Sequence, residues 1–206
     1  MIHFDMAPDQ RGPQVSKGLR MANTIDTLIE NVADYGKDIK LNFSTHVRQQ
    51  TELTPEQTWG TVLASAIATG NSEVIAAACE QAREFLSPQA AEAAKAAATI
   101  MAMNNIYYRF QHLAANKKYA TIPAKLRMNA IRTHGSDPVD FELWCTAVSA
   151  INGCGACVDS HEKVLREKGV GEEKILAAVR IASIVHAIAS LVATERAVPS
   201  TQPAVA

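Results

Sequence analysis

Two cysteines separated by two residues, Cys154 and Cys157, have the clearest chemical potential in this sequence. His161 follows four residues after Cys157, and Glu142 lies upstream on the preceding predicted helix. Because residues three and four apart in a helix lie one turn apart, the cysteines and the histidine would form one stripe at a helix start. A nucleophile, a base and an orienting carboxylate together can activate a thiol.

The glycines that flank the first cysteine, Gly153 and Gly155, would allow a tight entry into this helix and leave the Cys154 sulfur accessible. A helix N-terminus carries partial positive charge and unpaired N–H groups, and both favour the thiolate. The pKa of a free cysteine, about 8.5, falls to roughly 3.5–7.5 in such sites. Glu142 can fix the tautomer of His161 or take its proton.

A dithiol with such a proton relay supports two reactions. Its thiolate can attack the terminal oxygen of a hydroperoxide, which gives a sulfenic acid and an alcohol, and the second cysteine then condenses with the sulfenic acid. It can also reduce a disulfide of another protein through a mixed disulfide. Both reactions leave a Cys154–Cys157 disulfide, so turnover requires an external dithiol reductant.

Two other interpretations of the cysteine pair stay open. The pair and His161 are potential zinc ligands, but a structural zinc site needs four ligands, and the fourth would be Glu142, an uncommon choice. Two packed and inert cysteines are the second alternative, which the flanking glycines make less favourable. We therefore expect a redox site that contains no bound metal and no other bound cofactor.

The remaining candidate residues are interpreted as structural. Cys79 and Cys145 lie in apolar helical contexts and are predicted to belong to the core. His186, within an apolar helix, is predicted to be buried and hydrogen-bonded. Trp59, Trp144 and the methionines are also predicted to be core residues.

The composition excludes several classes of function. The 206 residues are 48% hydrophobic and 20% charged, and the net charge of −1 gives no electrostatic surface for nucleic acid or an anionic membrane. The sequence contains no run of 18 apolar residues, so no membrane span is predicted. Residues 1–20 lack the apolar region of a signal peptide. Four cysteines without an export signal favour a reducing cytoplasm.

Helical patterns follow one another along almost the whole chain, and no segment shows the alternation of a β-strand. A cap followed by proline marks the predicted starts at Thr54, Ser87 and Asp137. Residues 117–121 are predicted to be a loop. The predicted fold is all-α, with helices over residues 24–32, 39–47, 54–69, 72–85, 87–110, 123–133, 137–151, 154–169 and 172–194.

The domain organisation predicted from these patterns is simple. Residues 1–22 form a flexible leader, within which Met21 is an alternative start of the chain. Residues 23–195 form a single all-helical domain, and residues 196–206 form a disordered tail rich in Pro and Ala.

A weak internal repeat relates the two halves of the chain. Gln57-Thr58-Trp59 and Ser65-Ala66-Ile67 are matched by Glu142-Leu143-Trp144 and Ser149-Ala150-Ile151, at offsets of 85 and 84 residues. The repeat indicates a duplicated helical unit in which only the second copy carries the cysteine pair.

The sequence resembles the alkyl hydroperoxidase D family, a branch of the carboxymuconolactone decarboxylase-like superfamily. The resemblance covers about residues 21–195 and is not confined to the cysteine pair. The other segments that carry it are Lys37–Asn42, Trp59–Thr61, Met103–Arg109, Leu126–Asn129, Phe141–Trp144 and Ala147–Cys154.

The resemblance implies an all-helical subunit with an internal duplication, commonly assembled as a homotrimer. It implies a peroxidase that reduces alkyl hydroperoxides and regenerates a partner peroxiredoxin, the alkyl hydroperoxide reductase C protein. Its electrons would come from dihydrolipoamide on a lipoylated 2-oxoacid dehydrogenase acyltransferase, which lipoamide dehydrogenase recharges with NADH.

The resemblance also assigns roles to individual residues. Cys157 would become the sulfenic acid, and Cys154 would be the proton donor, the resolving thiol and the exposed cysteine of interchain mixed disulfides. His161 and Glu142 match the proton-relay residues of the family. The chain has Ala156 where some members have a second histidine, so the relay step of that histidine is absent or uses water.

Three alternative functions remain at this stage. The first is a disulfide reductase or redox adaptor with negligible peroxidase activity of its own. The second is a structural metal-binding module. The third is decarboxylase chemistry as in distant superfamily relatives, which would not require the cysteine pair.

Overall fold

The computed structural model describes residues 24–198 of the chain. This part is built from helices and contains no β-strand, which confirms the predicted all-α fold class. The predicted leader, residues 1–22, and residues 199–206 of the predicted tail lie outside the described residues. The elements are α1 (Ile25–Leu28), η1 (Asp34–Gly36), α2 (Lys37–Phe43), η2 (Ser44–Arg48), α3 (Pro55–Thr69), α4 (Ser72–Ala82), α5 (Pro88–Leu113), η3 (Lys117–Thr121), α6 (Ala130–Thr133), α7 (Pro138–Ile151), α8 (Gly155–Glu167) and α9 (Glu172–Ala197).

Local capping signals determine where the central helices begin. The Thr54 side chain accepts a hydrogen bond from the backbone N–H of Gln57, and the Gln57 side chain accepts one from the backbone N–H of Thr54. Ser87 and Asp137 also cap α5 and α7, each ahead of a proline, with a side-chain oxygen that accepts from backbone N–H groups of the first turn. These starts agree with the prediction. A capping oxygen accepts from a free N–H group of the first turn, and a proline at the first helical position lacks an N–H group that would have no partner there.

Several helix ends differ from the prediction. Helices α1 and α4 end earlier than predicted, at Leu28 and Ala82, whereas α9 continues to Ala197, so the first two residues of the predicted tail are helical. Residues 39–47 are shared between α2 and the π-helical turn η2. The apolar pattern continues past α1 because Ile29, in the turn that follows, still reaches the core.

The secondary structure between α5 and α7 differs most from the prediction. Lys117–Thr121 form a 3₁₀ helix, η3, where we predict a loop. The helix predicted to start at Pro123 is reduced to the single turn of α6. Lys125 explains the difference, because its φ of 52° lies in the left-handed region, which a right-handed helix cannot contain.

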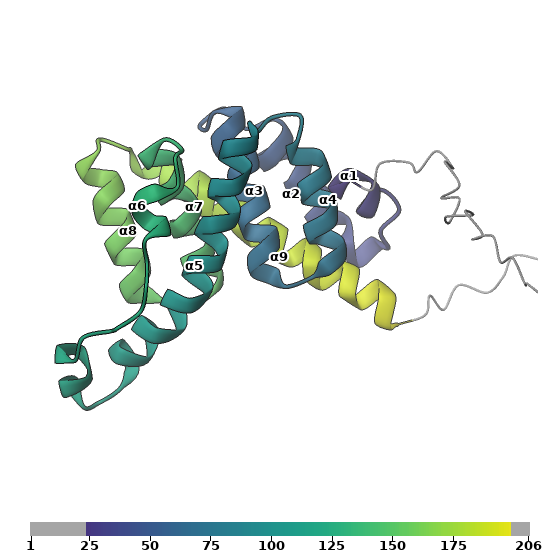
Figure 1. Cartoon of the computed structure of the whole chain (residues 1–206). Coiled ribbons are helices and arrows are strands. Elements are labelled where there is room, and N and C mark those ends of the chain that lie inside the picture. The colour runs from purple at the N-terminus through teal and green to yellow at the C-terminus, as the bar shows by residue number, and fades with distance from the viewer. Residues whose placement is uncertain (1–23, 199–206) are drawn as a thin grey trace, which may run out of the picture.

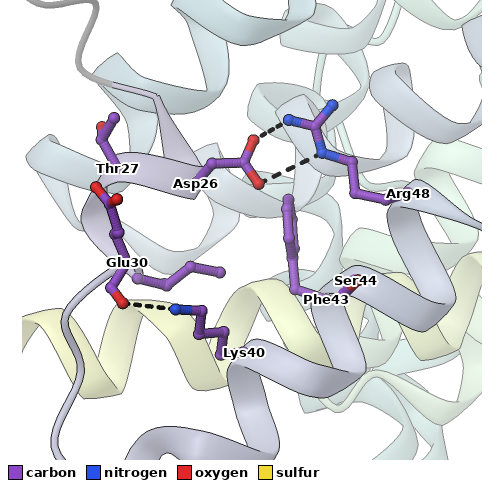
Figure 2. Close-up of a pocket in the computed structure, with 8 residues that line it drawn as sticks. Asp26, Thr27, Glu30, Lys40, Phe43, Ser44 and Arg48 are labelled. Carbon is purple, nitrogen blue, oxygen red and sulfur yellow. Dashed lines mark hydrogen bonds and ion pairs between the residues drawn. The ribbon is translucent and has the colours of Figure 1, made fainter.

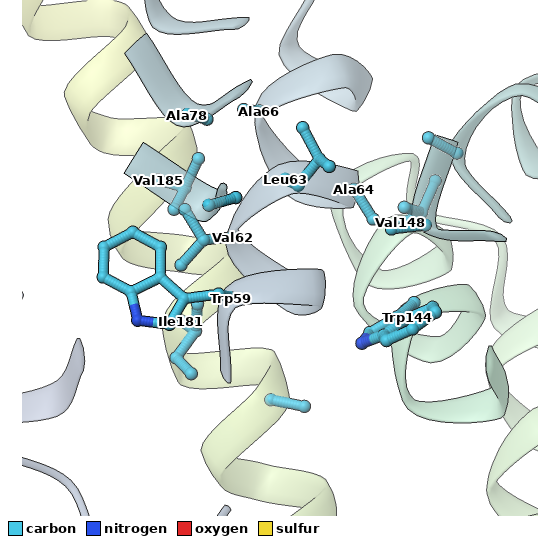
Figure 3. Close-up of a cluster of buried hydrophobic side chains, with 14 of the residues drawn as sticks. Trp59, Val62, Leu63, Ala64, Ala66, Ala78, Trp144, Val148, Ile181 and Val185 are labelled. Carbon is cyan, nitrogen blue, oxygen red and sulfur yellow. The ribbon is translucent and has the colours of Figure 1, made fainter. Parts of the chain in front are cut away.

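The core lies where α3 packs against α5, α7 and α9. Figure 3 shows Trp59 beside Ile181 of α9, and Trp144 on the far side of α3. Helices α3 and α7 approach so closely that a Cβ atom on Gly60 would lie 2.2 Å from the Trp144 ring. The Trp144 indole N–H donates to the carbonyl of Gln57 across the same interface (3.3 Å). Both tryptophans are therefore core residues, as predicted.

Helix α9 runs along the length of the body (Figure 1). Within residues 24–198 it is the one helix whose length and composition would allow it to cross a membrane. Most of its large apolar residues, including Ile181, Val185 and Ile188, are buried against other helices. Burial in the core accounts for this apolar character, and the cytoplasmic location stays a prediction.

The described part contains two successive three-helix units of similar dimensions. Helices α3, α4 and α5 have 15, 11 and 26 residues, and α7, α8 and α9 have 14, 13 and 26. A duplicated unit would produce this correspondence, and the duplication stays a prediction. The second half of α5 projects from the body together with η3 (Figure 1), and we call residues 106–126 the arm.

Candidate redox site

The cysteine pair stands at the start of α8, as its spacing predicts. Cys154 is the N-cap residue of α8 and Cys157 lies in the first turn. The two form a disulfide with a Cα–Cα distance of 5.3 Å. Gly153 supplies the turn that precedes the helix, because its φ of 64° is accessible to glycine at little cost.

A histidine–carboxylate pair lies one turn further along α8. His161 Nδ1 lies 2.6 Å from Oε2 of Glu142, which α7 contributes, and both side chains are largely buried. His161 Nε2 lies 3.2 Å from the sulfur of the buried Met101 of α5. The predicted contact between the imidazole and the carboxylate is therefore present, and it fixes the orientation of the ring.

These groups open on a cavity of about 370 Å³ between α5, α6, α7 and α8. Its volume lies within the range of small-molecule sites. The lining residues are Met101, Asn104, Tyr108, Met128, Ile131, Glu142, Ala156, Cys157, Ser160, His161 and Val164. A ligand in this cavity would thus lie next to both the Cys157 sulfur and the His161 imidazole, which can carry a proton.

The two sulfurs differ in their access to this cavity. Cys157 is 6% exposed and lines the cavity, whereas Cys154 is 0% exposed and does not. The predicted accessibility of the Cys154 sulfur is therefore wrong for this disulfide-bonded form. The backbone N–H of Cys154 donates to the carbonyl of Ser149 (3.1 Å), which holds the turn against the end of α7.

One wall of the cavity was not anticipated from the sequence. Met101, Asn104 and Tyr108 of α5 line it at intervals of three and four residues, so they share one face of that helix. Met128 also lines the cavity, although we predict the methionines to be core residues. The helical spacing of these α5 residues is visible in the sequence, but no sequence feature indicates that this face of α5 packs against α8.

The other candidate thiols are structural. Burial raises the pKa of the Cys145 thiol well above its usual value, and the nearby charge of Glu142 acts in the same direction. Cys145 is therefore an inert core residue, as predicted, and the partly buried Cys79 packs against the core. The prediction for His186 is wrong: it is exposed, on the face of α9 that also carries Ser183 and Ser190.

The zinc interpretation requires Cys154, Cys157, His161 and Glu142 to converge on one point. Within residues 24–198, no group of three or more His, Cys, Asp and Glu side chains is arranged to hold a metal ion. The geometry of the four residues matches a disulfide beside a hydrogen-bonded histidine instead.

A larger cavity, of about 420 Å³, lies between α1 and α2 (Figure 2). Asp26 pairs with Arg48 there, and the Lys40 ammonium group donates to the carbonyl of Glu30. These polar groups bond one another, and no cysteine or histidine lines the cavity. We therefore place the candidate site at the smaller cavity beside Cys157.

Comparison with known proteins defines the class of this fold and site. The model of the Carboxymuconolactone decarboxylase family matches residues 117–198, which include the cysteine pair, His161 and Glu142. Curated relatives called alkyl hydroperoxide reductase AhpD come from Acidobacterium capsulatum, Koribacter versatilis and Solibacter usitatus. The first is 66% identical over 84% of this chain and 94% of its own length. The second is 58% identical over 80% of this chain and 85% of its own length, and the third is 56% identical over 83% and 96%. The chain belongs to the alkyl hydroperoxidase D family of this superfamily.

Proposed function

We propose that this protein is an alkyl hydroperoxide reductase that uses the Cys154–Cys157 dithiol. The observation that carries the proposal is the position of Cys157, which lines a cavity beside the His161–Glu142 pair and forms a disulfide with Cys154. The name of the relatives, alkyl hydroperoxide reductase, supports the same reaction.

In the proposed reaction, the Cys157 thiolate attacks the terminal oxygen of a hydroperoxide. An S–O bond forms as the O–O bond breaks, and the leaving alkoxide takes the Cys154 proton through His161 and Glu142. The Cys154 thiolate that results then attacks the sulfenic acid, which releases hydroxide and forms the disulfide; protonation gives water. The sulfur pair is oxidised by two electrons and the peroxide is reduced to an alcohol. No bound metal, haem or flavin takes part.

Turnover requires a dithiol that reduces the disulfide. We propose dihydrolipoamide, presented by a lipoylated acyltransferase and recharged by lipoamide dehydrogenase, and a second role in regenerating the peroxiredoxin alkyl hydroperoxide reductase C. Mixed disulfides with these partners would form at Cys154. Because Cys154 is buried in the disulfide-bonded form, the turn at Gly153 must open before a partner sulfur reaches it.

We also propose that three copies of the chain assemble as a homotrimer. Large apolar side chains lie exposed along the arm, and contact with other copies of the chain would bury them. These side chains are Ile106, Phe110, Leu113, Tyr119, Ile122 and Leu126. Sedimentation of the whole chain is expected to give the mass of a trimer, and a monomer at micromolar concentration would contradict this assembly.

Trapping of the sulfenic acid tests the assignment of the two sulfurs. In Cys154→Ser the sulfenic acid cannot be resolved, so a hydroperoxide is expected to leave Cys157 as a stable sulfenic acid. A 1,3-diketone that adds to sulfenic acids, followed by peptide mass spectrometry, locates the modified cysteine. Cys157→Ser is the matched control and is expected to give no adduct at Cys154. An adduct at Cys154 instead would reverse the assignment.

A further inference from the structure

One polar side chain in the wall of the Cys157 cavity has an atom without a hydrogen-bond partner. Asn104 of α5 is 5% exposed, and its Oδ1 atom is buried with no partner among the described residues. Asn104 lines the same cavity as Cys157, Ala156 and His161. A buried acceptor without a partner costs free energy unless a group in the cavity donates to it.

The neighbouring asparagine shows how a structural amide is accommodated on the same helix. Asn105 is fully buried, its Nδ2 donates to Ser149 Oγ (3.0 Å), and its Oδ1 accepts from Asn152 Nδ2 (2.9 Å). Both ends of this amide are thus occupied within the protein. Asn104 lies one residue earlier and lines the cavity, and no group among the described residues donates to its buried Oδ1.

The other lining residues define the kind of ligand that fits. Glu142 and His161 bond each other, Ala156 has no polar side-chain atom, and Ser160 is exposed. The remaining walls are mainly apolar and come from Met101, Tyr108, Met128, Ile131 and Val164. Such a cavity suits a molecule with an apolar body and a small polar head that carries a hydrogen-bond donor.

We propose that Asn104 Oδ1 binds the substrate by accepting a hydrogen bond from the terminal O–H group of an alkyl hydroperoxide. The inference rests on the proposed function and identifies the group that holds the reacting oxygen. When the Cys157 thiolate attacks this oxygen, the oxygen keeps its hydrogen and becomes the sulfenic acid. The other oxygen leaves as the alkoxide and takes its proton from the His161 side of the cavity.

The position of this hydrogen bond has a consequence for selectivity. Every hydroperoxide has the same terminal O–H group, so Asn104 contributes equally to the binding of small and bulky substrates. The apolar walls would then determine which tail is preferred. A residue that merely shaped the cavity would affect substrates according to the size of their tails.

Asn104→Leu tests the proposal, because leucine has a similar volume and no hydrogen-bonding group. The measurement is the second-order rate constant for alcohol formation by the reduced protein in a single turnover, with cumene hydroperoxide and with tert-butyl hydroperoxide. We expect a loss of at least about tenfold, by the same factor for both substrates, and a melting temperature no lower than that of the unmodified protein. Asn42→Leu, at an exposed position on α2, is the matched control and is expected to stay within twofold.

Three results would overturn the proposal: an unchanged rate constant, a loss that depends on tail size, or a loss accompanied by a lower melting temperature. The last would show that the amide is structural. Asn104→Ala, which cannot overfill the site, replaces the leucine variant if that variant does not fold. Failure of the unmodified protein to form any alcohol would contradict the proposed function itself, and this result is distinct from the other three.

Discussion

At the scale of single residues, the surroundings of a cysteine decide whether it can react. Cys145 is fully buried, and burial raises the pKa of its thiol, so it stays protonated. Cys157 lies in the first turn of α8, where the backbone N–H groups favour a thiolate, and it lines a cavity. Only the second environment combines an available thiolate with space for a substrate.

The proton relay can be tested by Glu142→Gln. The amide can still accept a hydrogen bond from His161, but it carries no charge and cannot take up a proton. We expect alcohol formation to slow by about 100-fold and its dependence on pH to change, with the thermal unfolding transition retained. The measurement is single-turnover kinetics over a range of pH.

Glu162→Gln provides a matched control on α8, because Glu162 is a partly exposed carboxylate paired weakly with Arg166 (3.9 Å). Its rate is expected to stay within twofold of the unmodified protein. Equal rates and pH profiles for the Glu142 and Glu162 variants would show that the Glu142 carboxylate carries no proton.

Asp140, at the α3–α7 interface, is a second carboxylate with a testable role, because it makes the stability of the fold depend on pH. Burial raises the pKa of Asp140, although a hydrogen bond from Gln57 Nε2 (2.8 Å) opposes the shift. In the interval above the ordinary Asp pKa of about 3.9, the folded chain retains a proton that the unfolded chain has lost. Stability contributed by this group therefore falls as the pH rises through that interval.

Asp140→Asn removes this dependence, because asparagine can still accept the hydrogen bond from Gln57 but cannot ionise. We expect the variant to unfold at a higher urea concentration than the unmodified protein at pH 7. The difference is expected to shrink as the pH falls, because the unmodified carboxyl then takes up its proton. A variant that is less stable at pH 7, by an amount independent of pH, would contradict this account.

Residue spacing within one helix could be interpreted directly from the sequence. Cys154, Cys157 and His161 lie on α8, so helical periodicity alone placed them together. Glu142 required the family resemblance, because its contact with His161 depends on how α7 and α8 pack. Asn104 lies in a segment that carries the resemblance, but its unpaired oxygen atom is visible only in the tertiary structure.

At the scale of elements, the contact between α3 and α7 determines where Glu142 can lie. Gly60 allows this contact, since the buried ring of Trp144 occupies the space that a side chain at residue 60 would fill. The Trp144 indole also donates to the carbonyl of Gln57 (3.3 Å), which fixes the two helices relative to each other. The reactive helix α8 then follows α7 through the turn at Gly153.

Gly60→Ala is therefore expected to destabilise the fold by about 3 kcal/mol, because a Cβ atom 2.2 Å from the ring forces the helices apart. Gly155→Ala is the control, because no atom lies within 4 Å of a Cβ added there. Its effect is expected to lie between zero and a gain of about 1 kcal/mol, since alanine suits a helix better than glycine. Equal unfolding free energies for the two variants would contradict the packing described here.

The sequence predicted the starts of helices better than their ends. Starts depend on local capping groups such as Thr54 and Asp137, which are visible in the sequence. The helix predicted after η3 is wrong because Lys125 adopts a left-handed conformation, which follows from tertiary context rather than from its residue type. Ends such as that of α1 likewise depend on which side chains reach the core.

At the scale of the whole molecule, the two three-helix units differ in chemistry although they are similar in size. The second unit carries the cysteine pair and the histidine, and the first has neither at the start of α4. Ser149 of the second unit bonds Asn105, whereas the hydroxyl of Ser65, its counterpart in the internal repeat, has no partner among the described residues. The second unit thus provides the reactive residues, and α5 of the first unit supplies one wall of the cavity.

The central claim is that Cys154 and Cys157 pass together from thiols to a disulfide as a hydroperoxide becomes an alcohol. The most direct test adds a limiting hydroperoxide to the fully reduced protein and quantifies the alcohol and each cysteine by mass spectrometry. The account predicts one Cys154–Cys157 disulfide for each alcohol formed, with Cys79 and Cys145 still reduced. Alcohol formed while Cys154 and Cys157 remain thiols, or no alcohol at all, would contradict it.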